Sequence, residues 1–345
     1  TNLMEHTDMK KRVLTGINTT GTLHIGNYVG AIRPAIQDSK NPDVQSFFFM
    51  ADLHALIKCQ DPDRIERSRM QIAATWLAAG LDPERVVFYR QSDIPEIPLL
   101  NWMLTCCTSK GQMNRAHAYK AATDAAVAAG KDPDADVSMG LFCYPILMAA
   151  DILMFNANEV PVGHDQIQHL EMARDVATRF NNLYAKPDES FFVLPQATGG
   201  SAIEVLPGLD GRKMSKSYGN SIMLGATAEE TAKLIKKSPT DSERRITFDP
   251  VARPQVSALL TTAGLVTGRD PKDIAEEIGD SGAGALKAYV IESVNEFLAP
   301  HRERRAELAK DMDSIRDILH DGNKRANAIA EETLDQVREA MGMKY

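Results

Sequence analysis

Short apolar runs alternate with longer helix-like stretches through the first two-thirds of the chain, and this alternation limits the fold more than any other feature. Between two of the runs, Asp61 followed by Pro62 predicts a helix start and Gly80 its end. Strands separated by helices require right-handed crossovers, which produce a parallel sheet with helices on both faces. We expect strands at residues 12–15, 44–50, 86–90, 159–162 and 191–194.

The pattern changes after Gly225, where strand signals almost disappear and amphipathic helices follow. Residues 238–255 contain three prolines and predict a loop, and residues 123–136 predict a surface insertion. A chain of 345 residues also exceeds what one hydrophobic core usually supports. We therefore expect an α/β fold: a Rossmann-like, parallel-sheet nucleotide-binding domain in residues 10–224, followed by an all-helical C-terminal domain in residues 225–345.

The composition by itself argues against a dedicated nucleic-acid binder, because 47 acidic residues outnumber 39 basic ones. Four cysteines form no CxxC pair, and His164 and His169 miss the one-turn spacing of a helical metal pair, so no protein metal site is predicted. No apolar run of about 18 residues occurs and the amino terminus is polar, which favours a cytoplasmic protein.

The first chemical signal is a glycine-rich corner, Gly-Ile-Asn-Thr-Thr-Gly-Thr-Leu-His-Ile-Gly-Asn, at residues 16–27. It directly follows the first expected strand and opens a helix, whose free N–H groups and positive dipole end suit a phosphate. His24 and Asn27 can donate hydrogen bonds to phosphate oxygens. As a short motif it is weak alone, because an ordinary strand-to-helix corner looks the same.

The second signal is Lys-Met-Ser-Lys-Ser at residues 213–217, with glycines on both sides. The glycines suggest a loop that can close. Two lysines three residues apart, with hydroxyl residues between them, can bring charge and N–H donors onto one anion. The alternative, a plain basic surface loop, becomes less plausible when the motif is paired with the first corner.

Together, the two elements resemble the paired signatures of class I aminoacyl-tRNA synthetases. The His-Ile-Gly-Asn run corresponds to the family's HIGH element with Asn27 in its last place, and residues 213–217 match its KMSKS element. In that family an amino-acid carboxylate attacks the α-phosphate of ATP, and the protein supplies positioning and charge stabilisation.

Residues 140–169 indicate which amino acid is used. Asp151 is a carboxylate in an apolar helix, and a buried carboxylate needs a donor partner. Indole offers one N–H donor and no acceptor, so such a carboxylate can mark a tryptophan pocket. A surface acid or an internal salt bridge is the competing interpretation. The whole segment resembles the tryptophan-pocket region of tryptophanyl-tRNA synthetases of the bacterial type.

This resemblance implies ATP-dependent activation of L-tryptophan to tryptophanyl-adenylate, with Mg2+, and transfer to tRNA(Trp) by a homodimer whose helical domain reads the anticodon. It implies catalytic roles for His24, Asn27, Lys213 and Lys216. It implies ATP contacts from Asn18, Thr19, Thr20, Gly26, Asn27, Gly163, His164, Asp165, Lys213, Met214, Ser215, Lys216 and Ser217. It implies tryptophan contacts from Tyr144, Met148, Asp151, Val160, Val162 and Gln166. His54 could touch the amino acid or serve only the structure.

Three departures qualify the resemblance. Residues 18–20 read Asn-Thr-Thr where Gln-Pro-Ser is common, and His164 stands where a glutamate is usual. Lys120 is present, but Ala122 occupies the place of a second lysine, and Lys131 is a possible replacement.

Three other functions compete. A tyrosyl-tRNA synthetase shares the fold and both signatures, but Leu14 and the residues before Asp151 are too apolar for a hydroxyl that donates and accepts. A non-catalytic synthetase-like RNA-binding paralogue is disfavoured by the intact lysines, although Ala122 leaves it some room. A small adenylyltransferase would be shorter and would lack the helical tail.

Overall fold

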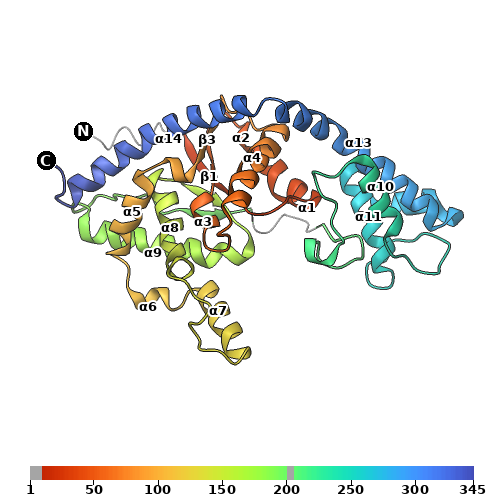
Figure 1. Cartoon of the computed structure of the whole chain (residues 1–345), viewed down its shortest axis with the longest axis horizontal. Coiled ribbons are helices and arrows are strands. Elements are labelled where there is room, and N and C mark those ends of the chain that lie inside the picture. Colours follow the sequence, from red (N-terminus) through yellow and green to blue (C-terminus); the bar gives the residue numbers. More distant parts are fainter. Residues whose placement is uncertain (1–9, 200–205) are drawn as a thin grey trace.

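A five-stranded parallel sheet forms the centre of the amino-terminal two-thirds of the molecule (Figure 1). The structure is a computed structural model that describes residues 10–199 and 206–345. Its strands are β1 (Lys11–Ile17), β2 (Val44–Met50), β3 (Val87–Arg90), β4 (Glu159–Pro161) and β5 (Gln196–Thr198). The spatial order is β3-β2-β1-β4-β5, so the direction of winding reverses between β1 and β4. In such sheets ligands bind at the carboxyl ends of the strands beside this reversal.

The fifth expected strand, at residues 191–194, is wrong. The strand that pairs with β4 is β5, which begins two residues later, and residues 191–194 form no strand. The Phe192 ring is instead fully buried, 4.8 Å from the ring of Phe180. An apolar run can fill a core as a loop as well as in a strand, and pattern alone does not separate the two.

Helices cover both faces of the sheet. Successive side chains of β2 point in opposite directions: Phe47 and Phe49 belong to one buried cluster, while Phe48 and Met50 belong to the other. The first cluster includes side chains of α5, α8 and α9, and the second includes α4 and much of the carboxyl-terminal part. The helices of the first two-thirds are α1 (Ile25–Asn27), α2 (Arg33–Ser39), α3 (Asp52–Ala55), α4 (Pro62–Ala78), α5 (Glu96–Thr105), α6 (Lys110–Met113), α7 (His117–Ala128), α8 (Met139–Met154) and α9 (Ile167–Tyr184). Short turns lie at η1 (Tyr28–Ile32), η2 (Gln91–Asp93), η3 (His164–Gln166) and η4 (Lys216–Tyr218).

The carboxyl-terminal part is helical, which confirms the expected fold class. It comprises α10 (Ala228–Lys237), α11 (Pro254–Thr267), α12 (Pro271–Ile278), the short turn η5 (Gly279–Ser281), α13 (Ala283–Ala309) and α14 (Met312–Ala340). The segment before α11 is a loop, as its prolines predict. Figure 1 shows α13 and α14 as one long arch over the molecule, with α14 lying along the sheet part. The division at residue 225 into two domains stays a prediction.

The edge strand β3 is covered by α14. A Cβ atom at Gly322 would overlap the carbonyl oxygen of Phe88, so the helix backbone approaches the strand directly. The backbone N–H of Arg90 donates to Asn323 Oδ1 at 3.0 Å, and Arg325 donates to the Val86 carbonyl at 2.9 Å. Helix side chains thus satisfy backbone groups that an open sheet edge would leave unpaired.

Helices α6 and α7 project away from the body (Figure 1). The segment at residues 123–136, predicted as a surface insertion, is largely exposed, and its first part belongs to α7. Within the described ranges, no helix has the length and apolarity needed to cross a membrane.

Candidate active site

The first signature forms the turn between β1 and α1. His24 caps the helix: the N–H of Asn27 donates to His24 Nδ1 at 3.2 Å, and the His24 N–H donates to Asn27 Oδ1 at 3.0 Å. Because Nδ1 accepts, the neutral ring carries its proton on Nε2 and can donate from there. Burial lowers the pKa of His24, which favours this neutral form.

The residues before the cap form a tight loop. Asn18 Oδ1 accepts from the N–H of Thr20 at 2.9 Å and from its hydroxyl at 2.8 Å. The Thr20 carbonyl in turn accepts from Arg64 at 3.0 Å. Thr19 is buried, and its hydroxyl has no partner among the described residues. The Asn18 amide oxygen is therefore occupied within the protein, and its NH2 group remains to donate to a ligand.

The second signature is held by Asn220. Its Oδ1 accepts from the Ser215 N–H at 3.0 Å, and its Nδ2 donates to Asp210 Oδ1 at 2.8 Å and to the Lys213 carbonyl at 3.0 Å. A Cβ atom at Gly208 would lie 2.1 Å from Asn220 Nδ2, so this packing requires a glycine there. No role was predicted for Asn220; the available signal was an asparagine three residues after the Lys-Met-Ser-Lys-Ser run.

The two signatures lie against one another, although almost 190 residues separate them. The Ile25 N–H donates to the Ile222 carbonyl at 2.8 Å, and the Leu224 N–H donates to the Leu23 carbonyl at 3.0 Å. Between these bonds, His24 and Met223 form an antiparallel bridge. On the other side, a Cβ atom at Gly26 would lie 3.3 Å from Met214 Sδ. The histidine corner and the lysine loop thus share one surface.

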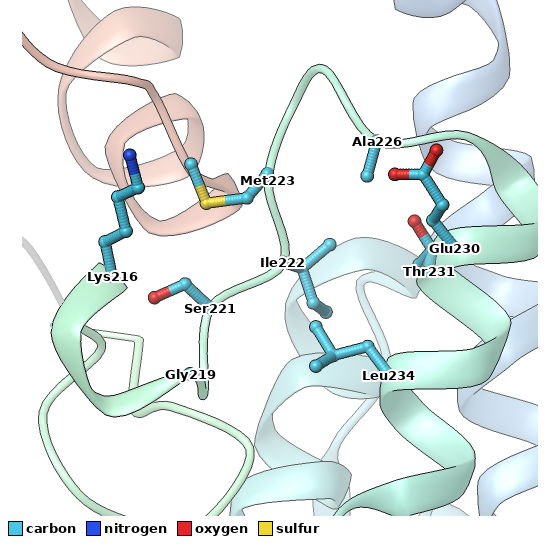
Figure 2. A pocket seen from close by; sticks show the side chains of 9 residues that line it. All are labelled: Lys216, Gly219, Ser221, Ile222, Met223, Ala226, Glu230, Thr231 and Leu234. Atoms are coloured by element: carbon cyan, nitrogen blue, oxygen red, sulfur yellow. The ribbon is translucent and has the colours of Figure 1, made fainter.

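A cavity of about 280 Å³ adjoins this contact (Figure 2). Figure 2 shows Lys216 and Met223 on the side of the loop that faces the amino-terminal ribbon. The cavity is lined by Lys216, Gly219, Ser221, Ile222, Met223, Ala226, Glu230, Thr231 and Leu234. It therefore lies between the lysine loop and α10, where a change in the loop would alter its shape.

The third cluster follows β4, the neighbour of β1 in the sheet. Gly163, His164 and Asp165 form an exposed turn there. A Cβ atom at Gly163 would lie 2.9 Å from Asp165 Oδ1, so glycine allows the carboxylate to fold back on the backbone. This turn and the His24 corner occupy the same edge of the sheet, at the point where the strand order reverses.

Asp151 lies on α8 and is 1% exposed. His54 Nε2 is 2.8 Å from its Oδ2, and Gln91 Nε2 is 2.8 and 2.9 Å from its two oxygens. Burial raises the pKa of Asp151, while the hydrogen bonds from His54 and Gln91 oppose this rise. A surface acid is thereby excluded. The sequence pattern did not predict the contact of Gln91 with Asp151, because 60 residues separate the two.

Tyr144, Gln166 and His169 form a second polar group. The Tyr144 hydroxyl lies 2.7 Å from His169 Nδ1, which is also 2.9 Å from Gln166 Oε1. The rings of His54 and Tyr144 meet edge to face at 5.9 Å, so this group adjoins the Asp151 group. Val160 is buried, and Met148 and Val162 are partly buried against the same core.

The projecting part carries both Lys120, which the family pattern retains, and Lys131, the possible replacement for the lysine missing at Ala122. Lys120 is exposed on α7, and Lys131 Nζ is 3.4 Å from Asp136 Oδ2 near the tip. The structure therefore assigns neither lysine to the signature surface.

Over residues 10–199 and 206–345, no three His, Cys, Asp or Glu side chains gather as a metal site would need.

Comparisons with known proteins agree on one family. The family model described as tRNA synthetases class I (W and Y) matches residues 7–299. A Bordetella pertussis protein named tryptophan–tRNA ligase is 53% identical over 97% of this chain and 74% of its own length. A Neisseria meningitidis protein of the same name is 51% identical over 97% of this chain and 98% of its own. The crystal structure of tryptophanyl-tRNA synthetase from Campylobacter jejuni, complexed with ADP and tryptophan, superposes with a TM-score of 0.84 at 37% identity, covering 96% of this chain and 99% of that one.

Proposed function

This chain belongs to the class I tRNA synthetases for tryptophan and tyrosine, and from this we propose that it joins L-tryptophan to tRNA(Trp) in an ATP-dependent reaction. It is an aminoacyl-tRNA ligase. The observation that carries the proposal is the contact between the two signatures, where His24 bridges Met223 and Gly26 faces Met214. This contact supports the proposal because it brings the two signatures together at one end of the sheet.

ATP binds at the signature surface. The turn that opens α1 and the lysines of residues 213–217 surround its phosphates, while Gly163, His164 and Asp165 hold the ribose. Asn18, Thr19, Thr20 and Gly26 border the phosphates, and Met214 borders the adenine. Mg2+ enters with the ATP phosphates, as this ion commonly does.

Tryptophan binds in front of Asp151. The indole N–H donates to the carboxylate, which is already oriented by Gln91 and His54. Met148, Val160 and Val162 line the apolar walls. Tyr144 and Gln166 bind the ammonium group. A tyrosine substrate fits this arrangement less well because its hydroxyl both donates and accepts, whereas the Asp151 carboxylate only accepts.

The chemistry needs position and charge rather than a covalent nucleophile. A carboxylate oxygen of tryptophan forms a bond to the α-phosphorus, the bond from this phosphorus to the bridging oxygen breaks, and pyrophosphate leaves. His24, Asn27, Lys213 and Lys216 stabilise the charge on the phosphate oxygens. The acyl group then passes to the 2′-hydroxyl of the terminal ribose of the tRNA, and AMP leaves.

The partners are tRNA(Trp) and a second copy of this chain. Residues 225–345 form the part that reads the anticodon. Trp102 on α5 is 65% exposed, and Leu99 is exposed one turn before it, which supports a homodimer contact on this helix. Light scattering should then give twice the mass of the chain. A tRNA substrate also favours the cytoplasm as the place of the reaction.

Amino-acid-dependent exchange of pyrophosphate into ATP tests the function. We expect exchange with tryptophan and very little with tyrosine or phenylalanine, followed by charging of tRNA(Trp). Faster exchange with tyrosine would favour the tyrosyl enzyme. No exchange with any of the three amino acids, from a folded sample with Mg2+, would favour a non-catalytic paralogue.

A further inference from the structure

His169 joins the two side chains that are proposed to hold the substrate ammonium group. It lies on α9 and is 1% exposed. Its Nδ1 atom is 2.7 Å from the Tyr144 hydroxyl and 2.9 Å from Gln166 Oε1. Tyr144 comes from α8 and Gln166 from η3, so one buried nitrogen connects three elements.

Counting the protons decides the direction of these bonds. An amide oxygen can only accept, so Nδ1 must carry a hydrogen and donate it. The amide is oriented this way because Gln166 Nε2 lies 3.4 Å from Asp165 Oδ2, where only its NH2 end is favourable. Burial lowers the pKa of His169, so the ring is neutral with its single proton on Nδ1.

The consequence is one free acceptor, the phenol oxygen. Burial raises the pKa of Tyr144, so the phenol keeps its hydrogen, which it directs to Gln166 Oε1 at 3.4 Å. The phenol oxygen shares the Nδ1 hydrogen with Gln166 Oε1 and retains one lone pair, whereas Gln166 Oε1 already accepts from both Nδ1 and the phenol. A primary ammonium group has three donors and no acceptor, so an acceptor held in one orientation matches it.

We propose that His169 is a positioning residue, whose Nδ1–H, shared with Gln166, fixes the Tyr144 oxygen as an acceptor for the substrate ammonium group. The proposal rests on the proposed function, because that function supplies the ammonium ligand. His169 itself does not touch the substrate. Without its hydrogen, the phenol and the amide are free to rotate and to turn donors toward the cation.

Two partial ligands separate positioning from general packing. Tryptamine carries the indole and the ammonium group, whereas indole-3-propionate carries the indole and no ammonium group. Both are measured as competitors of tryptophan in pyrophosphate exchange. In His169→Leu, we expect tryptamine binding to weaken about tenfold, as for a hydrogen bond to a charged group. Binding of indole-3-propionate should change by less than about twofold, within the scatter of single-site effects.

Donor-retaining and donor-lacking variants provide the control. Asparagine places its amide nitrogen near the position of Nδ1, so His169→Asn should recover most of the tryptamine affinity. Glutamine reaches only the position of Nε2, so His169→Gln should behave as His169→Leu, and it serves if the leucine variant does not fold. Equal weakening of both competitors, or loss in His169→Asn as large as in His169→Gln, would overturn the proposal. Failure of the proposed function would appear differently, as no tryptophan-dependent exchange in the unaltered protein.

Discussion

Gln91 Nε2 lies 2.8 Å from Oδ1 and 2.9 Å from Oδ2 of Asp151, and it donates to both oxygens of this buried carboxylate. The other end of the amide accepts from the backbone N–H of Leu53 at 3.0 Å, so its orientation is fixed. One side chain thus links the start of α3 to the last turn of α8. The charge of Asp151 depends on this link, because an unpartnered buried carboxylate would take up a proton.

Replacing Gln91 with methionine should therefore weaken tryptophan binding by about tenfold, the size expected for one hydrogen bond to a charged group. The pKa of Asp151, already raised by burial, should rise further. Because the ionised carboxylate accepts the indole N–H more strongly than the protonated acid does, kcat/KM for tryptophan should recover as the pH increases. A pH profile of exchange measures this. If kcat/KM in the variant fell at low pH just as it does in the unaltered protein, Gln91 would not control the charge of Asp151.

Asp151→Asn should reduce the preference for tryptophan over phenylalanine by about 2 kcal/mol, since a buried donor–acceptor match is lost. The ratio of the two kcat/KM values in pyrophosphate exchange measures the preference. Asp175→Asn on α9 is the matched control, because the same change outside the pocket should leave the ratio unaltered. Unchanged tryptophan activation in Asp151→Asn would remove Asp151 from the site.

Lys216→Ala should lower kcat about 100-fold or more with little change in the KM for tryptophan, because its charge acts mainly when the phosphorus is attacked. Pyrophosphate exchange separates the two parameters without tRNA. Lys237→Ala, an exposed lysine on α10, is the control and should leave exchange unchanged. An effect on KM larger than that on kcat would argue against a role in the transition state.

Gly208→Ala should displace Asn220, since the added methyl would lie 2.1 Å from Asn220 Nδ2. The loop of residues 213–217 then loses its hydrogen bonds with Asn220. We expect kcat to fall by about tenfold or more while the fold persists. Gly225→Ala is the control, because a Cβ atom there meets nothing within 4 Å. Circular dichroism and exchange kinetics test the pair. Equal activity in the two variants would show that Asn220 does not organise the loop.

His301 on α13 should make stability depend on pH. Burial, with the nearby Arg305, Arg304 and Arg302, lowers its pKa from 6.5 to about 4. Between these values the unfolded chain binds a proton that the folded protein excludes. The contribution of His301 to the free energy of unfolding should therefore be fully present above pH 6.5. It should fall by about 3 kcal/mol as the pH drops to 4.

Replacing His301 with phenylalanine should flatten this dependence. Neither ring nitrogen has a partner among the described residues, so phenylalanine should cost little stability at pH 7 and should keep the edge contact with Tyr28. Urea unfolding midpoints between pH 4 and 7 measure the effect. The same slope in both proteins would mean that His301 does not carry the dependence.

The sequence alone determined the fold class and the two signatures. Strands separated by helices allow few topologies, and a glycine-rich corner after the first strand predicts a helix start that binds anions. Asp151 could be singled out because a carboxylate in an apolar helix needs a partner. The roles of Asp151 and of the other site residues stay predictions.

Only the tertiary structure decided which groups meet. Gln91 reaches Asp151 across 60 residues of sequence, and His24 meets Met223 across almost 200. The run at residues 191–194 illustrates the same limit, because Phe192 fills the core although the run does not join the sheet. Periodicity reports which side of an element is buried, since burial depends on local spacing. Periodicity cannot report which residue a buried side chain contacts, because that contact depends on how distant elements pack together.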